Sequence, residues 1–284
     1  MKAQQTWSTP VRNENKVSVP CAICGGGAFL PFIECAGYSY VRCVDCGLVQ
    51  INPQPEPAQV RERYGEAYFK YERDNEEAFF KLGRLALRDA GIDKIEKRLW
   101  DAGNRRALEI GCATGALLEY LRGRGWQTKG VEISKPEAEY AVRERGLDVS
   151  TLTLEDNRFA SNHFAIVTAS HLIEHLNDPA AFVGEVYRVL APGGVFLVTT
   201  PNITGLQAKV YRHLWRSAIF DHLYLFSKKT LRKLLEKYGF EIEKTVTWGG
   251  IARGFAPKPI KLVLDRAAKI FGFGDVVFMR CIKR

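Results

Sequence analysis

The sequence predicts an α/β protein, in which helices cover both faces of a doubly wound, mostly parallel sheet, with a small cysteine-rich module in front of it. Two observations carry this prediction. Between residues 106 and 200, short apolar runs alternate with segments of helical periodicity, which is the order of elements in a parallel sheet. Ahead of them stand two Cys-x-x-Cys-Gly motifs, and the 284 residues suffice for one large domain and one small module.

Composition and charge are those of a globular protein with a basic surface. The formal net charge of +9 favours anionic partners, such as nucleic acid, acidic glycans, phospho-sugars or an anionic membrane. No apolar run approaches the roughly 20 residues that span a bilayer, and residues 1–20 lack the apolar stretch of a signal peptide. We therefore expect a cytoplasmic protein, with peripheral membrane contact left open.

Four cysteines form the N-terminal module, for which we expect residues 1–55 with a flexible lead over 1–19. Eighteen residues separate the two pairs, and such pairs bind Zn²⁺ tetrahedrally; the proposed ligands are Cys21, Cys24, Cys43 and Cys46. Residues 29–34 and 38–42 would be the strands of a zinc ribbon. A closed four-sulfur site has no open position for catalysis, so we expect a structural zinc, with RNA or partner binding as the alternative.

Residues 56–100 are expected to link the two units. Alternating prolines over 52–57 favour an extended connector, and helices are predicted at 58–64, 76–90 and 92–100. The segment is a packed bridge or a partial lid over the site, and its aromatic side chains would serve a lid; they are Tyr64, Tyr68, Phe69 and Tyr71.

The stretch from 105 to 134 organises the main domain. A strand at 106–110 leads into a turn with Gly111, Ala113 and Gly115, then a helix at 116–122 and a strand at 128–133 that contains Glu132. Glycines let a ligand lie against the backbone, and a carboxylate after the second strand can accept hydrogen bonds from a ribose diol. A dinucleotide site would have the spacing G-x-G-x-x-G, whereas this turn reads G-x-A-x-G.

The remaining elements complete a seven-stranded sheet. A capping box of Ser134 and Glu137 opens a helix at 135–145, and Asp178 with Pro179 opens another at 180–190. Ser227 would cap a third helix at 228–238. The further strands are expected at 147–153, 164–170, 195–200, 240–247 and 275–283, with an aromatic and basic insertion at 203–225.

Polar residues follow several of these strands, and a helix near the C-terminus is amphipathic. Ligands bind at the carboxyl ends of parallel strands, where Gly111, Glu132, Glu155, His171 and Asn202 fall.

Within residues 258–271 one apolar stripe alternates with basic residues. We expect the stripe to pack on the domain; the alternative is contact with an anionic membrane. The stripe is Ile260, Val263, Leu264, Ala267 and Ile270, and the basic residues are Lys258, Lys261, Arg266 and Lys269.

From Ala107 to Asn202 the chain resembles the class I S-adenosylmethionine-dependent methyltransferases. The Glu109-to-Gly115 loop and Glu132 carry this resemblance, and Glu174-His175-Leu with Asp178-Pro179 is similar to the ubiquinone-biosynthesis-like, type 11–12–23 branch. The cysteine module resembles zinc-binding modules fused to methyltransferases of sugar, lipid and polysaccharide pathways. The resemblance implies a Rossmann-like fold, a methyltransferase domain over 101–284, and Ala113 in place of the usual middle glycine.

The resemblance also implies the site residues. S-adenosylmethionine would contact Glu109, Gly111, Cys112, Ala113, Gly115, Glu132, Ile133, Leu154, Glu155, Ser170 and His171. His171, His175 and His222 are the candidate catalytic bases. In some relatives the corresponding residues bind a divalent metal, so His171, Glu174 and His175 could instead be ligands.

The predicted reaction is O-methylation of a small-molecule, sugar, glycan or lipid acceptor. No Asn/Asp-Pro-Pro-aromatic motif is present, which disfavours amine methylation of bases or protein amides. The alternative is an RNA-directed methyltransferase that uses the zinc ribbon and the basic surface to bind its substrate. The acceptor and the oligomeric state stay open.

Overall fold

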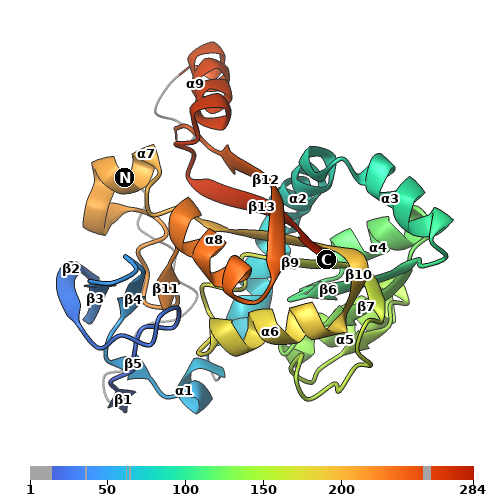
Figure 1. Ribbon diagram of the computed structural model, residues 1–284, viewed down its shortest axis with the longest axis horizontal. Helices are drawn as coiled ribbons and strands as arrows, with labels where there is room; N and C mark the ends of the chain where they lie inside the picture. Colours follow the sequence, from blue (N-terminus) through green and yellow to red (C-terminus); the bar gives the residue numbers. More distant parts are fainter. Residues whose placement is uncertain (1–14, 36, 62, 64, 252–256) are drawn as a thin grey trace.

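The structure, a computed structural model, describes residues 15–35, 37–61, 63, 65–251 and 257–284. A twisted central sheet carries helices on both faces, and a smaller sheet lies beside it (Figure 1). The order of the seven strands is β12-β13-β10-β9-β6-β7-β8, with only β13 antiparallel to its neighbours. This confirms the predicted doubly wound, mostly parallel, Rossmann-like sheet.

The strands differ from the predicted ranges mainly at their ends. They are β6 (Arg106–Ile110), β7 (Gln127–Val131), β8 (Val149–Ser150), β9 (Phe164–Ser170), β10 (Leu190–Pro201), β12 (Phe240–Trp248) and β13 (Val276–Lys283). The third predicted strand, 147–153, is reduced to two residues because only Val149 and Ser150 pair with β7, at the sheet edge. β10 begins before Val195 because Leu190 already pairs with β9, ahead of a break in register.

Alternating side chains of β10 explain why helices cover both faces. Val195 and Leu197 pack with the helices α2 (Glu66–Ala90), α3 (Ile92–Asp101) and α4 (Ala116–Gly123). Phe196 and Val198 point to the other face, against α6 (Pro179–Val189) and α8 (Lys228–Lys237). All four side chains are almost fully buried. A strand buried on both faces reads as a continuous apolar run, as in this sequence.

Two of the three predicted helix caps are present. Asp178 accepts hydrogen bonds from the backbone N–H groups of Ala180 and Ala181, and Ser227 forms a capping box with Thr230. The capping box at Ser134 is wrong. Its hydroxyl contacts the carboxylate of Glu137, and its side chain makes no capping bond to the backbone of α5 (Lys135–Arg145).

The N-terminal module shares a sheet with the insertion at 203–225. Strands β2 (Phe29–Cys35), β3 (Tyr38–Cys43) and β4 (Val49–Ile51) form the predicted ribbon, and β11 (Tyr224–Leu225) adds a fourth strand beside β4. The buried hydroxyl of Tyr40 lies 2.6 Å from two carbonyl oxygens of the insertion. Because the sheet crosses the predicted boundary, the division at residues 55 and 100 stays a prediction.

Two residues before the ribbon pair with the proline-rich connector. Residues 1–14 of the predicted lead lie outside the described residues. Lys16–Val17 form β1, which pairs with β5 (Gln54–Pro55) in the proline-rich connector. Two residues of the predicted lead are therefore paired with the connector.

The second linker helix is longer than predicted, whereas the first is shorter. After α1 (Pro57–Arg61), α2 starts ten residues before the predicted position 76, because apolar residues continue its inner face toward the N-terminus. Tyr64, one of the four lid aromatics, lies outside the described residues. Phe69 and Tyr71 contact Tyr140 and Phe79, while Tyr68 faces the cavity described below.

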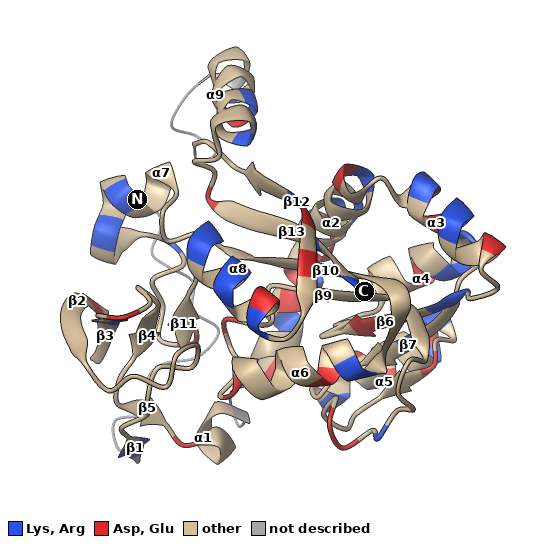
Figure 2. Cartoon of the chain, in the orientation of Figure 1, with Lys and Arg blue, Asp and Glu red and all other residues tan. Residues whose placement is uncertain are grey.

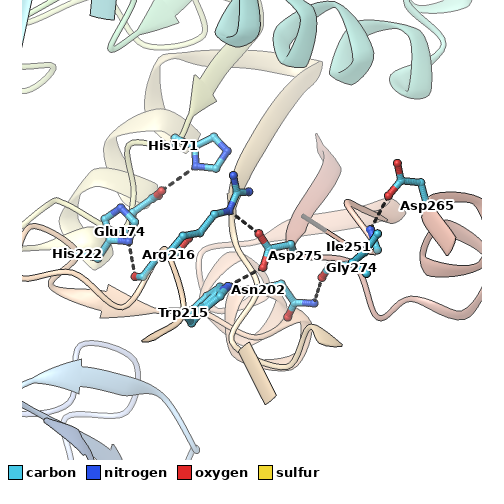
Figure 3. Close-up of polar contacts among 12 residues, drawn as sticks. His171, Glu174, Asn202, Trp215, Arg216, His222, Ile251, Asp265, Gly274 and Asp275 are labelled. Atoms are coloured by element: carbon cyan, nitrogen blue, oxygen red, sulfur yellow. Dashed lines mark hydrogen bonds and ion pairs between the residues drawn. The ribbon is translucent and has the colours of Figure 1, made fainter. Parts of the chain in front are cut away.

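The aromatic side chains of the insertion are largely structural. The insertion contains α7 (Leu206–Tyr211) and a short 3₁₀ helix, η1 (Arg212–Leu214). Trp215, Phe220 and Tyr224 are almost fully buried. The carboxylate of Asp275, itself buried, accepts hydrogen bonds from the Trp215 indole at 2.6 Å and the Arg216 guanidinium at 2.7 Å (Figure 3). This pair of bonds ties the insertion to β13.

Helix α9 (Lys258–Phe271) departs from its predicted role. It projects from the end of the β12–β13 hairpin, away from the sheet (Figure 1). Ile260, Val263 and Ile270 of the predicted stripe are more than half exposed, so packing of the stripe on the domain is wrong. No helix in the described part of the chain combines the length and apolar character that crossing a bilayer requires.

Candidate active site

A cavity of about 460 Å³ opens at the carboxyl ends of β6, β7 and β9. In doubly wound sheets, ligands bind where the strand order reverses. Here this point lies between the adjacent strands β6 and β9, because the chain continues from β6 to β7 on one side and from β9 to β10 on the other. The volume suits a small organic ligand. Helix α2 closes one side of the cavity and the start of α6 another. The arrangement provides a site of the size and place expected for a cofactor with its substrate.

The predicted cofactor residues converge on this cavity. Those that line it are Glu109, Gly111, Cys112, Ala113, Glu132, Ile133, Leu154, Glu155, Ser170 and His171. Gly115 does not line it. A Cβ at Gly115 would lie 2.4 Å from a methyl carbon of Leu147, so this glycine allows the helix after the turn to pack closely on its neighbour.

The turn after β6 adopts three left-handed conformations in five residues. Gly111 has φ +69°, Ala113 +46° and Gly115 +79°. An L-residue in this region costs roughly 1–2 kcal/mol, which Gly avoids. The conformation at Ala113 is held by its N–H, which donates to Oε2 of Glu132 at 2.9 Å. The methyl group that distinguishes Ala113 from glycine is therefore tolerated at the expense of backbone strain.

Glu132 and Glu109 place two carboxyl groups at the base of the cavity. Oε1 of Glu132 accepts a hydrogen bond from the N–H of Ser134 at 2.8 Å. Burial raises the pKa of Glu132 to about 7, against the opposing effect of its two backbone donors. Burial, and then the charge of Glu132, raise the pKa of Glu109 to about 8. Oε2 of Glu109 is buried without a hydrogen-bond partner, as expected for a group that awaits a polar ligand.

Two acidic residues of α2 were missed by the sequence analysis. Glu72 and Glu76 line the cavity together with Tyr68, Phe79, Phe80 and Gly83. Burial, together with the charges of Glu132 and Glu137, raises the pKa of Glu72 to about 8, although Tyr68 opposes this by hydrogen bonding. The spacing of Tyr68, Glu72 and Glu76 at intervals of four was the available signal, because it places all three on one helix face.

These carboxyl groups predict a pH-dependent stability in the absence of ligand. In the folded chain Glu72 and Glu109 keep their protons up to about pH 8, whereas in the unfolded chain they lose them near the ordinary glutamate pKa of 4.5. The folded state then binds more protons, so the free energy of unfolding falls as pH rises. Between pH 6.5 and 8 we expect a loss on the order of 3 kcal/mol.

Thermal or denaturant unfolding over this window measures the effect. The buried histidines His175 and His222 oppose this effect only slightly, because in the unfolded chain they titrate near the ordinary 6.5 and have few protons left to lose above that pH. Glu109→Gln removes one titrating group and should flatten the slope, while the exposed Glu139→Gln should not. A wild-type stability that stays constant or increases between pH 6.5 and 8 contradicts the prediction.

His171 stands at the wall of the cavity, directly after β9, and pairs with a buried carboxylate. Its Nδ1 lies 3.2 Å from Oε1 of Glu174 (Figure 3). The hydroxyl of Thr200 donates to Oε2 of Glu174 at 2.9 Å. Burial alone would raise the pKa of Glu174, but the hydrogen bond from His171 and the nearby histidines lower it to about 2. His171 has φ +52°, a strained conformation of the kind found at functional sites.

The other two candidate histidines lie deeper. Nδ1 of His175 is 3.0 Å from the carbonyl of Asp221, and Nδ1 of His222 is 2.8 Å from the carbonyl of Ser217. Burial lowers the pKa of both, that of His222 to about 3. His175 lines the cavity, whereas His222 packs edge-on against His175 behind it.

The candidate metal ligands near the cavity differ from the predicted set. Glu174, His175 and His222 have ligand atoms within 4.8 Å of one another, so His222 replaces His171 in this group. Of the three, His175 alone lines the cavity.

The four predicted zinc ligands cluster at the N-terminal module. Their sulfur atoms all lie within 4.8 Å of one another, with Cys21 3.3 Å from Cys46 and Cys24 3.5 Å from Cys43. The glycines after the two pairs, Gly25 and Gly47, have φ +75° and +82°, because each closes a tight turn. Burial opposes ionisation of Cys43, but backbone N–H groups and neighbouring cysteines lower its pKa to about 7.

Known proteins match the part of the chain that builds this cavity. A family model described as "Methyltransferase domain" matches residues 84–245. A ubiquinone biosynthesis O-methyltransferase of Bradyrhizobium is 36% identical over 124 residues, which cover 41% of this chain and 49% of the relative. A probable S-adenosylmethionine-dependent methyltransferase of Mycolicibacterium smegmatis is 31% identical over 166 residues, or 57% of each chain. The chain thus spans about half the length of the curated relatives it matches.

Solved structures match more of the chain. A methyltransferase of Thermotoga maritima, described as S-adenosylmethionine-dependent and as a possible histamine N-methyltransferase, has a TM-score of 0.54 and 25% identity, covering 76% of this chain and 98% of its own. An Archaeoglobus fulgidus S-adenosylmethionine-dependent methyltransferase has a TM-score of 0.54 at 19% identity, which shows the shared fold. Since the family model covers more than half of the sequence, including the turn after β6, Glu132 and His171, the chain belongs to the methyltransferase domain family, together with these S-adenosylmethionine-dependent enzymes.

Proposed function

We propose that the protein transfers the methyl group of S-adenosylmethionine to an oxygen of a small-molecule, glycan or lipid acceptor. The cofactor, when bound, supplies a methyl group activated by a sulfonium. The cavity fits such a ligand because the carboxyl groups of Glu72, Glu76, Glu109 and Glu132 line it, and the positive sulfonium of the bound cofactor would favour their ionised forms. The buried Oε2 of Glu109, which has no partner, adds an acceptor for a ligand donor.

The chain's own residues would divide the tasks of holding the cofactor. Glu132, already oriented by the N–H groups of Ala113 and Ser134, would accept hydrogen bonds from the ribose hydroxyls. Ile133, Leu154 and Glu155 line the part of the cavity beyond Glu132, where the adenine would lie. The backbone from Gly111 to Ala113 would lie under the methionine part.

The observation that carries the proposed O-methylation is the pairing of His171 with Glu174. Transfer to a hydroxyl requires removal of its proton while the acceptor is held in line with the methyl group. With Nδ1 of His171 bound to Glu174, Nε2 is the ring nitrogen that can take this proton. The ionised Glu174 would stabilise the imidazolium that forms. The names of the ubiquinone O-methyltransferase relatives support oxygen as the acceptor atom.

Methyl-labelled S-adenosylmethionine tests the acceptor class. The protein is incubated with labelled cofactor and cell extract, which is then divided into lipid, small polar, glycan, RNA and protein pools. Label in the lipid, glycan or small polar pool supports the proposal, and hydrolysis of the product should show an O-methyl group. Label in RNA would instead favour the RNA-directed alternative, and absence of label in all pools contradicts methyl transfer.

We also propose that the four-cysteine cluster binds one structural Zn²⁺. Tetrahedral zinc with bonds of about 2.3 Å separates its sulfur ligands by roughly 3.8 Å, within the range of the cluster. Four protein ligands leave no open position, and the small ribbon has little core of its own.

Removal of this metal should unfold the module. We expect one zinc per chain by elemental analysis, and its loss in Cys43→Ser should lower the melting temperature by several degrees, because thiolate–zinc bonds no longer join the two turns. Cys35→Ser is the matched control, since Cys35 lies in the same sheet and outside the cluster. A metal-free wild-type chain that melts like the zinc-loaded one would refute the structural role.

A further inference from the structure

Several large apolar side chains of α9 point to solvent rather than into the protein. Ile260, Val263, Ile270 and Phe271 are 52%, 68%, 68% and 74% exposed. At about 100° per residue these four positions fall within roughly one third of the helix circumference. They form one stripe, here called the outer stripe, along the side of α9 away from the sheet; Leu262, which is 69% exposed, lies outside this stripe. Soluble proteins rarely expose a contiguous apolar surface of this kind without a function.

Polar contacts on the opposite side fix the direction of the outer stripe. The hydroxyl of Thr247 donates to the carbonyl of the buried Ala268 at 2.7 Å. Lys269 pairs with Asp89 at 2.6 Å, and the carboxylate of Asp265 accepts a hydrogen bond from the N–H of Gly250 at 2.8 Å (Figure 3). Rotating the helix to bury the stripe would break all three contacts. The exposure is therefore a built feature of the fold.

A second exposed apolar segment is joined to the C-terminal end of α9. The N–H of Leu206, the first residue of α7, donates to the carbonyl of Phe273, two residues beyond α9, at 2.8 Å. Leu206, Val210 and Leu214 are 40%, 64% and 53% exposed. Most of the large exposed apolar side chains of the described residues thus belong to these two neighbouring segments.

Basic side chains accompany both segments. Lys209 on α7 and Arg212 just after it are exposed, and Arg266 is exposed on α9 beside the outer stripe; Arg216 is exposed too, but its guanidinium pairs with Asp275. Figure 2 shows Lys and Arg on α7, α8 and α9. The whole chain carries a formal net charge of +9. An apolar strip with basic neighbours is the composition of helices that lie in the interface of an anionic bilayer.

We propose that the outer stripe of α9 docks on the surface of an anionic lipid bilayer. The apolar side chains would enter the headgroup region, while Arg266 and the basic residues of α7 would face the lipid phosphates. A second copy of the chain is the poorer occupant, because it would bring two sets of basic residues together at short range. The projection of α9 from the body also leaves it free to meet a flat surface (Figure 1). This inference does not depend on the proposed methyl transfer.

Sedimentation of the full chain with lipid vesicles tests the proposal. We expect binding to vesicles of phosphatidylcholine with about one third phosphatidylglycerol, and at least tenfold weaker binding to phosphatidylcholine alone. Added salt should weaken the binding by screening. The triple variant Val263→Ser, Ile270→Ser and Phe271→Ser should bind anionic vesicles at least tenfold more weakly than the wild type, with an unchanged melting temperature because all three side chains are exposed.

A control triple variant removes three exposed apolar side chains elsewhere on the protein. Leu30→Ser, Val44→Ser and Val142→Ser change side chains that are 60%, 56% and 47% exposed, and this protein should bind vesicles like the wild type. Wild-type-like binding by the α9 variant would overturn the proposal, as would equal binding to neutral vesicles. Light scattering that shows a wild-type dimer dissociated by the α9 substitutions would overturn it in favour of a second copy.

Discussion

Replacing His171 by glutamine is expected to lower kcat by about 10²- to 10⁴-fold, which is the usual loss when a general base is removed. Glutamine keeps a polar side chain of similar reach but cannot take the acceptor proton. The ring of His171 lies on the cavity wall and is oriented by Glu174, so the loss should fall on the chemical step. Steady-state transfer of labelled methyl to the identified acceptor measures kcat.

Binding and control measurements separate this role from a structural one. The dissociation constant of S-adenosylmethionine should change by less than about threefold in His171→Gln. His213→Gln, on the exposed 3₁₀ helix, should leave kcat unaltered. Glu174→Gln should reduce kcat and shift its pH profile, because the imidazolium loses a carboxylate partner. If His171→Gln keeps a normal kcat, the base is a different group, and His175 is the next histidine on the cavity wall.

Glu132→Ala should raise the dissociation constant of S-adenosylmethionine by at least about 100-fold, since two charge-assisted hydrogen bonds to the ribose are lost. The same carboxylate holds the N–H groups of Ala113 and Ser134, so the turn that cradles the cofactor also loses its support. Calorimetric titration with S-adenosylmethionine measures the change. Binding should also weaken below about pH 7 in the wild type, where Glu132 becomes protonated.

Two control measurements distinguish a specific loss of cofactor binding from unfolding of the variant. Glu139→Ala, on the exposed side of α5, should bind the cofactor like the wild type. Without ligand, the melting temperature of Glu132→Ala should lie no more than a few degrees below that of the wild type. The substitution removes the hydrogen bonds of Glu132, but it also removes the cost of burying a partly ionised carboxyl group. Cofactor affinity that survives the substitution would refute the assignment of Glu132.

The sequence by itself determined the architecture and most of the candidate site. Strand–helix alternation and buried apolar runs are local patterns that pack compactly only as a parallel sheet covered by helices. The sheet and the turn after β6 therefore followed from these patterns. The residues around the cavity could be named because strand ends in a parallel sheet meet at one edge. Gly111, Glu132 and His171 are far apart in the chain and were still placed together by this rule.

Only the tertiary structure decided which segments far apart in the sequence come into contact. Glu72 became part of the site because α2 folds over the cavity, and no local pattern reports where a helix docks. The pairing of β11 with β4 joins residues more than 170 positions apart, so the module and the insertion could not be related from sequence. The stripe of α9 has the periodicity of a buried face, but periodicity does not tell whether that face points toward the protein or toward solvent. Polar contacts of Asp265, Ala268 and Lys269 on the other side turn that stripe toward solvent.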